Sequence, residues 1–144
     1  MRKVKVGIAG LGRLGKVHAH NIAYKISNAE LTAACSIVSA ELEYAKKELG
    51  VTDVYTDYRV MLEKADIDAA AIVTTSGEHC WQIAAALDAG KHVFSDKPLG
   101  VTVEECRLAE EAVERHPEAV FFLGFMRRFD PSYAYAKKKI EEGV

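Results

Sequence analysis

Short apolar runs alternate with amphipathic segments from one end of the chain to the other. The apolar runs have the length of strands and cover residues 4–10, 31–37, 54–55, 69–74, 92–96 and 119–125. The segments that follow them repeat their apolar residues every three or four positions, as one face of a helix does. This alternation predicts βαβ units around a parallel sheet that is buried on both faces.

Six strands with interleaved helices predict an α/β fold of the Rossmann type, a doubly wound parallel sheet of about six strands in three layers. The expected strand order is 3-2-1-4-5-6, and one such domain would occupy residues 1–144. Ligands of this fold bind at the carboxyl edge of the sheet. Residues that carry chemistry are therefore expected directly after the strands.

Local signals mark several helix boundaries. Ser39 is placed as an N-cap of the second helix, and Thr102 with Glu105 forms the T-x-x-E capping box of the fifth. The last helix, 130–142, is expected to have one apolar face and a solvated, lysine-rich face.

Composition and charge exclude several classes of protein. The 144 residues are 49% hydrophobic and 28% charged, which is typical of a globular domain rather than a disordered chain. A formal net charge of −2 provides no positive field for nucleic acid. No apolar run approaches the ~20 residues of a membrane span, and the amino terminus does not resemble a signal peptide. We therefore expect a cytoplasmic protein without nucleic-acid or membrane partners.

The cysteines and histidines do not predict a metal site. Cys35, Cys80 and Cys106 lack the C-x-x-C spacing and are interpreted as buried apolar side chains. His18 and His20 are two positions apart, so a helix would point them to different faces.

A glycine motif follows the first strand. Gly10, Gly12 and Gly15 satisfy G-x-G-x-x-G between a predicted strand and a predicted helix, the context that makes this motif informative. The glycines allow a tight turn, an approach to a pyrophosphate and close packing of helix on strand. We predict that this loop, including Arg13 and Leu14, binds a dinucleotide at the helix amino terminus.

The choice between NAD and NADP depends on the end of the second strand. Rossmann domains place an acidic residue there, which binds the adenosine ribose and repels a 2′-phosphate. Here the position is held by Ser36, 21 residues after Gly15. A neutral hydroxyl predicts that NADP is tolerated at least comparably with NAD. Arg13 is either a partner of the extra phosphate or a solvent-facing side chain, and both interpretations stay open.

Asp96-Lys97-Pro98 ends the fifth strand, at the edge where the nicotinamide half of a dinucleotide would lie. A lysine there can hydrogen-bond a substrate hydroxyl and stabilise developing negative charge on its oxygen. An ordinary surface lysine at a strand end is the alternative.

These residues together resemble the amino-terminal domain of the Gfo/Idh/MocA family, which includes glucose-fructose oxidoreductase and inositol 2-dehydrogenases. The resemblance is carried by GIAGLGRLG (7–15), the stretch 67–100 with its AGKHVFSDKP run, and GFMRRFDPSYAYAKKKI (124–140). Family members transfer hydride from a ring hydroxyl of a cyclitol or sugar to a nicotinamide cofactor. The resemblance therefore implies NAD or NADP as cofactor and a small-molecule substrate.

The resemblance also assigns roles to residues. Lys97 matches the lysine of the family's E-K-P motif and is implied to bind substrate and relay a proton. Met126 and Arg127 match positions near the cyclitol, although Met126 as core filler is an equal alternative. Residues after the fourth strand are implied to contact the nicotinamide side: Thr74, Thr75, Ser76 and His79. For His79 the alternative is a packing role at the start of a helix. Asp96 stands where the family's glutamate is usual, and Asp96 and Lys97 are also expected to bind the cofactor.

The family continues into a second α+β domain that supplies a histidine general base, and the 144 residues do not include it. We therefore expect a fragment or truncated form of an enzyme that forms homo-oligomers. This chain would bind the dinucleotide without turning over a polyol. The alternative is a stand-alone, non-catalytic dinucleotide-binding module.

Overall fold

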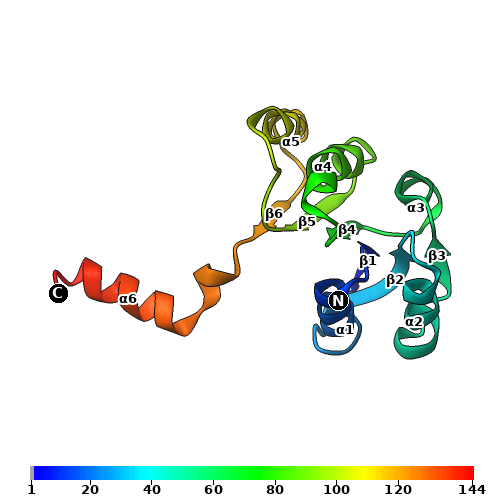
Figure 1. Ribbon diagram of the computed structural model, residues 1–144, viewed down its shortest axis with the longest axis horizontal. Coiled ribbons are helices and arrows are strands. Elements are labelled where there is room, and N and C mark those ends of the chain that lie inside the picture. The colour runs from blue at the N-terminus through cyan, green and yellow to red at the C-terminus, as the bar shows by residue number, and fades with distance from the viewer. Residues whose placement is uncertain (1) are drawn as a thin grey trace.

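The computed structural model describes residues 2–144 and contains one six-stranded sheet in which all neighbouring strands run parallel (Figure 1). In chain order the strands are β1 (Val4–Ala9), β2 (Ala29–Cys35), β3 (Asp53–Tyr55), β4 (Ala69–Ile72), β5 (His92–Asp96) and β6 (Phe121–Gly124). They stand in the order 3-2-1-4-5-6. The predicted Rossmann arrangement is thereby confirmed.

Helices cover both faces of the sheet and complete three layers. They are α1 (Arg13–Tyr24), α2 (Ser39–Leu49), α3 (Tyr58–Lys64), α4 (His79–Asp88) and α5 (Val103–Arg115). The chain also forms α6 (Pro131–Glu141) and the 3₁₀ turns η1 (Ser76–Glu78) and η2 (Met126–Phe129). One core lies between the sheet and α1 and α2, with Ile8 fully buried in it. The other lies under α3, α4 and α5 and contains Ile72. Burial of each such isoleucine contributes about 1.5–3 kcal/mol.

Four strands end earlier at the carboxyl edge than their apolar runs predicted, and of these β6 ends one residue early, at Gly124. β1 ends at Ala9 because Gly10 turns the chain with a φ of +87°. β2 ends at Cys35 and β4 at Ile72. The residues beyond the ends of β1, β2 and β4 leave the sheet and line a cleft instead, where Ile37 is 91% exposed, so the apolar runs continued past the paired part of each strand.

The helix caps were predicted with mixed success. The capping box of Thr102 and Glu105 is confirmed, with both reciprocal hydrogen bonds present. Ser39 as N-cap is wrong, because Ser39 is the first helical residue and Val38 holds the cap position. The hydroxyl of Ser36 accepts a hydrogen bond from the Val38 amide at 3.0 Å. A side chain from the end of β2 therefore orders the turn into α2.

The three cysteines are free thiols. Cys35 and Cys80 are buried as expected, whereas Cys106 is partly exposed, which corrects the expectation for that residue. Burial raises the pKa of the Cys80 thiol to about 11.

The last helix, α6, extends away from the sheet and contacts mainly η2 (Figure 1). Its expected apolar face is exposed, with Ile140 at 75% of its accessible surface. Among residues 2–144, no helix is long and apolar enough to cross a membrane.

Candidate functional site

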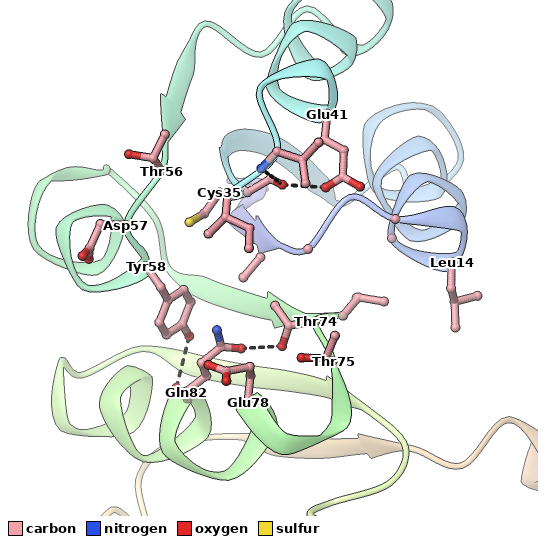
Figure 2. Close-up of a pocket in the computed structure, with 18 of the residues that line it drawn as sticks. Leu14, Cys35, Glu41, Thr56, Asp57, Tyr58, Thr74, Thr75, Glu78 and Gln82 are labelled. Carbon is pink, nitrogen blue, oxygen red and sulfur yellow. Dashed lines mark hydrogen bonds between the residues drawn. The ribbon is translucent and has the colours of Figure 1, made fainter.

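A cleft of about 730 Å³ opens at the carboxyl edge of the sheet, where the strand order reverses between β1 and β4 (Figure 2). The ends of β1, β2 and β4 and the starts of α1, α2, α3 and α4 form its walls. Its lining comprises Ala9, Gly10, Gly12, Arg13, Leu14, Gly15, Cys35, Ser36, Ile37, Val38, Glu41, Thr56, Asp57, Tyr58, Arg59, Val73, Thr74, Thr75, Glu78, Trp81 and Gln82. The whole predicted glycine loop, Ser36, Thr74 and Thr75 are thus brought together in one cavity.

Each glycine of the loop has its own geometric reason. A Cβ on Gly10 would lie 2.5 Å from the Val73 carbonyl oxygen, and a Cβ on Gly15 would lie 2.0 Å from the Gly10 carbonyl oxygen. The fold itself therefore requires both glycines. Gly12 differs, because the nearest atom to its Cβ position is Oε1 of Glu41 at 4.0 Å. At Gly12 the missing side chain keeps the cleft open. It is not needed to avoid an overlap with the backbone.

The loop lies directly before the amino terminus of α1, whose N-cap is Gly12 with an extended ψ of −168°. The first-turn N–H groups of a helix lack intrahelical acceptors and carry a partial positive charge. A pyrophosphate can approach them here because no Cβ stands in front of the helix. The loop fits the diphosphate of a dinucleotide.

A carboxylate occupies the β2 side of the cleft. The Ser36 hydroxyl donates a 2.5 Å hydrogen bond to Oε2 of Glu41, in the first turn of α2. Figure 2 shows Glu41 reaching down from α2 beside the loop that leaves β1. The position that was predicted to be neutral is therefore next to a negative charge.

Hydrogen bonds stabilise the β4 side of the cleft. The Thr74 hydroxyl donates to Oε1 of Gln82 at 2.6 Å, and the Tyr58 hydroxyl donates to the Gln82 carbonyl oxygen at 3.2 Å (Figure 2). Burial, together with the negative charge of Asp57, raises the pKa of the Cys35 thiol to about 11, so the thiol stays protonated at neutral pH. This wall offers the hydroxyls of Thr74 and Tyr58 and the amide of Gln82, beside the carboxylate of Glu78.

His79 connects two loops behind the cleft. Its Nδ1 lies 2.7 Å from the Pro98 carbonyl oxygen and its Nε2 lies 3.1 Å from the Thr74 carbonyl oxygen. The side chain is 2% exposed and does not line the cleft. The geometry favours the alternative of a packing residue at the start of α4, which positions the loops after β4 and β5.

Replacing His79 by alanine is expected to lower the free energy of unfolding by about 1–3 kcal/mol, because the buried imidazole is lost and the Thr74 and Pro98 carbonyls lose their ring partner. Urea unfolding followed by circular dichroism measures the change. His20→Ala, at an exposed position of α1, is the control and should change stability by less than about 0.5 kcal/mol. An equally small effect of His79→Ala would show that the two loops do not depend on the imidazole.

The residues assigned to substrate, and Asp96, which was expected to bind the cofactor together with Lys97, lie outside the cleft. Lys97 is exposed after β5 and is joined to Pro98 by a cis peptide bond, and Asp96 is the last residue of that strand. Met126, 62% exposed, and Arg127 lie on η2 beyond β6. The exposure of Met126 contradicts the interpretation of it as core filler.

The strand order explains this spread. β4, β5 and β6 lie side by side in this order in the sheet, so the loops after them follow one another along the carboxyl edge. Arg127 is held by an ion pair to Asp130 at 2.9 Å. Ser76, in η1, also lies outside the lining.

Several lining residues escaped sequence reasoning. Gln82 and Trp81 lie on the first turns of α4, and Tyr58 begins α3. Glu41 carried a usable signal, because the first turn of the helix after β2 lies at the carboxyl edge of the sheet, where Rossmann folds bind their ligands. The others had no local signal, since their side chains were equally consistent with core packing.

Comparison with known proteins places this geometry in a family. Residues 4–125 match the family model GFO_IDH_MocA, described as "Oxidoreductase family, NAD-binding Rossmann fold". Over 141 residues the chain is 38% identical to scyllo-inositol 2-dehydrogenase (NAD(+)) of Bacillus subtilis, covering 98% of this chain and 41% of the relative.

Solved structures show the same similarity. Scyllo-inositol dehydrogenase from Lactobacillus casei, with bound NAD(H) and scyllo-inositol, is 54% identical with a TM-score of 0.95, over 99% of this chain and 42% of that one. Myo-inositol 2-dehydrogenase from Lactobacillus plantarum is 42% identical with the same TM-score and coverage. The chain thus spans about two fifths of the length of these relatives. It belongs to the Gfo/Idh/MocA oxidoreductase family, of which it carries the NAD-binding Rossmann fold.

Proposed function

We propose that this chain is the dinucleotide-holding part of an NAD(P)-dependent dehydrogenase that oxidises a ring hydroxyl of a cyclitol or sugar. The observation that carries the proposal is the glycine loop, Gly10 to Gly15, set before α1 at the point where the strand order reverses. The similarity to enzymes named as inositol dehydrogenases supports the substrate class.

Different cleft residues would hold different parts of the dinucleotide. The amino terminus of α1 faces the pyrophosphate position, and Arg13 and Leu14 of its first turn line the cleft. Thr74 and Thr75 present hydroxyls at the end of β4, and Ser76 follows them in η1. We assign these three to the nicotinamide side, where Gln82 and His79 hold the loop in place.

Lys97 is assigned to the substrate. Its ammonium group can donate a hydrogen bond to a ring hydroxyl and stabilise negative charge as the hydroxyl proton leaves. The bound cofactor would supply the hydride acceptor. Asp96 borders this position on β5, and Met126 and Arg127 on η2 are assigned to the far side of the ring.

A hydroxyl oxidation also needs a group that accepts the proton. His79 cannot serve, because its ring nitrogens face the Thr74 and Pro98 carbonyls and the side chain is buried. A protonated Lys97 has no free lone pair. The 144-residue chain is therefore expected to bind the dinucleotide without oxidising inositol, since a positioned base contributes about 10² to 10⁴-fold.

A chimaera tests the substrate assignment. This chain would replace the matching part of the Lactobacillus casei enzyme, to which it is 54% identical. Reduced nicotinamide is followed by absorbance with scyllo- and myo-inositol. We expect turnover by the chimaera that Lys97→Met lowers at least about 100-fold. Lys64→Met, at an exposed position of α3, is the matched control.

The isolated chain is tested in parallel by calorimetric titration with NAD and NADP. Binding without turnover supports the proposal. A chimaera that folds and binds the dinucleotide but oxidises no polyol would favour the non-catalytic module. Absence of dinucleotide binding would overturn both the dehydrogenase proposal and the non-catalytic module. We place the enzyme in the cytoplasm as a homo-oligomer, a location with which the free thiols of Cys35, Cys80 and Cys106 are compatible.

A further inference from the structure

We propose that the carboxylate of Glu41 makes the cleft selective for NAD over NADP, in the role that an acidic residue at the end of β2 has in other Rossmann domains. The inference rests on the proposed function, since it concerns the cofactor that the cleft would hold. It reverses the expectation drawn from Ser36 alone.

The carboxylate is held in place by two hydrogen bonds in series. The Val38 amide donates to the Ser36 hydroxyl at 3.0 Å, and this hydroxyl donates to Oε2 of Glu41 at 2.5 Å. The amide orients the hydroxyl, so its only hydrogen points at the carboxylate. Ser36 therefore presents the charge of Glu41 rather than a free neutral group.

The other carboxylate oxygen of Glu41, Oε1, faces the end of the cleft where the adenosine ribose would lie. Oε1 of Glu41 lies 4.0 Å from the Cβ position of Gly12, across the gap between the ends of β1 and β2. Ser36, Ile37, Val38 and Glu41 line this end of the cleft. The adenosine ribose of a dinucleotide lies at this end when its pyrophosphate is at the glycine loop.

The charges favour an unphosphorylated ribose. Oε1 remains available to accept a hydrogen bond from a ribose hydroxyl, which is a charge-assisted bond. A 2′-phosphate in the same place would bring up to two further negative charges against the carboxylate, inside a partly desolvated cleft. It also offers the carboxylate no hydroxyl donor.

Two cations also line the cleft, and either would have to offset this charge. The guanidinium of Arg59 lies over the Trp81 ring, 5.0 Å from its centroid. Arg13 is exposed at the first position of α1, and within residues 2–144 its side chain has no hydrogen bond or ion pair. The fixed group is therefore the carboxylate, whereas Arg13 must give up side-chain entropy before it can bind a phosphate.

Calorimetric titration of the 144-residue chain with NAD and with NADP tests the inference. We expect the parent to bind NAD at least about tenfold more tightly. Glu41→Gln keeps an acceptor for the Ser36 hydroxyl and removes only the charge, and it should shift the NAD-to-NADP affinity ratio toward NADP by about 10 to 100-fold. Glu48→Gln removes one charge from an exposed position of the same helix and should change the ratio less than twofold.

Salt dependence separates charge from shape. Raising the salt concentration from about 0.05 M to about 0.5 M should reduce the discrimination against NADP in the parent and leave it unchanged in Glu41→Gln. Arg13→Ala should weaken both dinucleotides by the same factor.

Three results would overturn the inference: a parent that binds NADP as tightly as NAD, a Glu41→Gln variant with the parent's ratio, or a loss confined to NADP in Arg13→Ala. A parent that binds neither dinucleotide instead contradicts the proposed function. If the parent binds NAD and Glu41→Gln leaves the NAD-to-NADP affinity ratio unchanged, only the role of Glu41 is contradicted.

Discussion

Gly15→Ala is expected to lower the free energy of unfolding by about 3 kcal/mol or more, and to leave the chain partly unfolded at 25 °C if its total stability is small. A Cβ at this position would lie 2.0 Å from the Gly10 carbonyl oxygen, which belongs to the turn between β1 and α1. Both atoms are attached to backbone, so no side-chain rotation relieves the overlap. The helix would have to move away from the sheet that it covers.

Urea unfolding followed by far-ultraviolet circular dichroism measures this effect. Gly77→Ala is the matched control, because a Cβ at Gly77 meets no atom within 4 Å and its φ is not positive. We expect its stability to stay within about 0.5 kcal/mol of the parent's. Equal urea midpoints for Gly15→Ala and Gly77→Ala would show that α1 tolerates a larger separation from the turn.

Gly12→Val is expected to abolish dinucleotide binding while the fold persists. The affinity for NAD should fall at least about 100-fold, which corresponds to about 3 kcal/mol of binding free energy. The φ of Gly12 is −63° and its Cβ position meets only Oε1 of Glu41, at 4.0 Å. A branched side chain therefore fits the backbone and projects into the cleft in front of the α1 amino terminus. It would occupy the space through which a pyrophosphate reaches the first-turn N–H groups.

Two measurements on the same sample separate binding from folding for this variant. Calorimetric titration gives the affinity, and the fluorescence of Trp81, the one tryptophan of the sequence, reports on the cleft that it lines. Urea unfolding should give a stability within about 1 kcal/mol of the parent's. Tight NAD binding by Gly12→Val would place the dinucleotide away from the glycine loop.

The three glycines show how far a motif predicts a site. G-x-G-x-x-G between a strand and a helix predicted the loop, the turn and the cleft, and all are present. The motif alone could not tell that a Cβ at Gly10 or Gly15 would overlap backbone atoms, whereas a Cβ at Gly12 would have room and point into the cleft. This difference depends on which atoms surround each Cβ position, and those atoms come partly from the end of β4.

The site on the substrate side was predicted only in its order along the edge. Lys97 and Met126 follow β5 and β6, as their place in the chain required, and the parallel sheet brings the ends of these strands to one edge. The role of His79 was open in the sequence. Its hydrogen bonds to Thr74 and Pro98 join loops that are 24 residues apart, and no periodicity encodes such a contact.

By itself the sequence determined the helices and strands of this protein and their order. The signals for them are the spacing of apolar residues, the glycines at turns and helix caps such as Thr102, and each acts over only a few residues. The parallel order of the sheet followed from the alternation of strand and helix. Only the tertiary structure decided what charge stands at the β2 end of the cleft. Ser36 is neutral as a residue, yet the turn into α2 returns Glu41 to it and to Gly12, and Coulomb interactions depend on separation in space rather than along the chain.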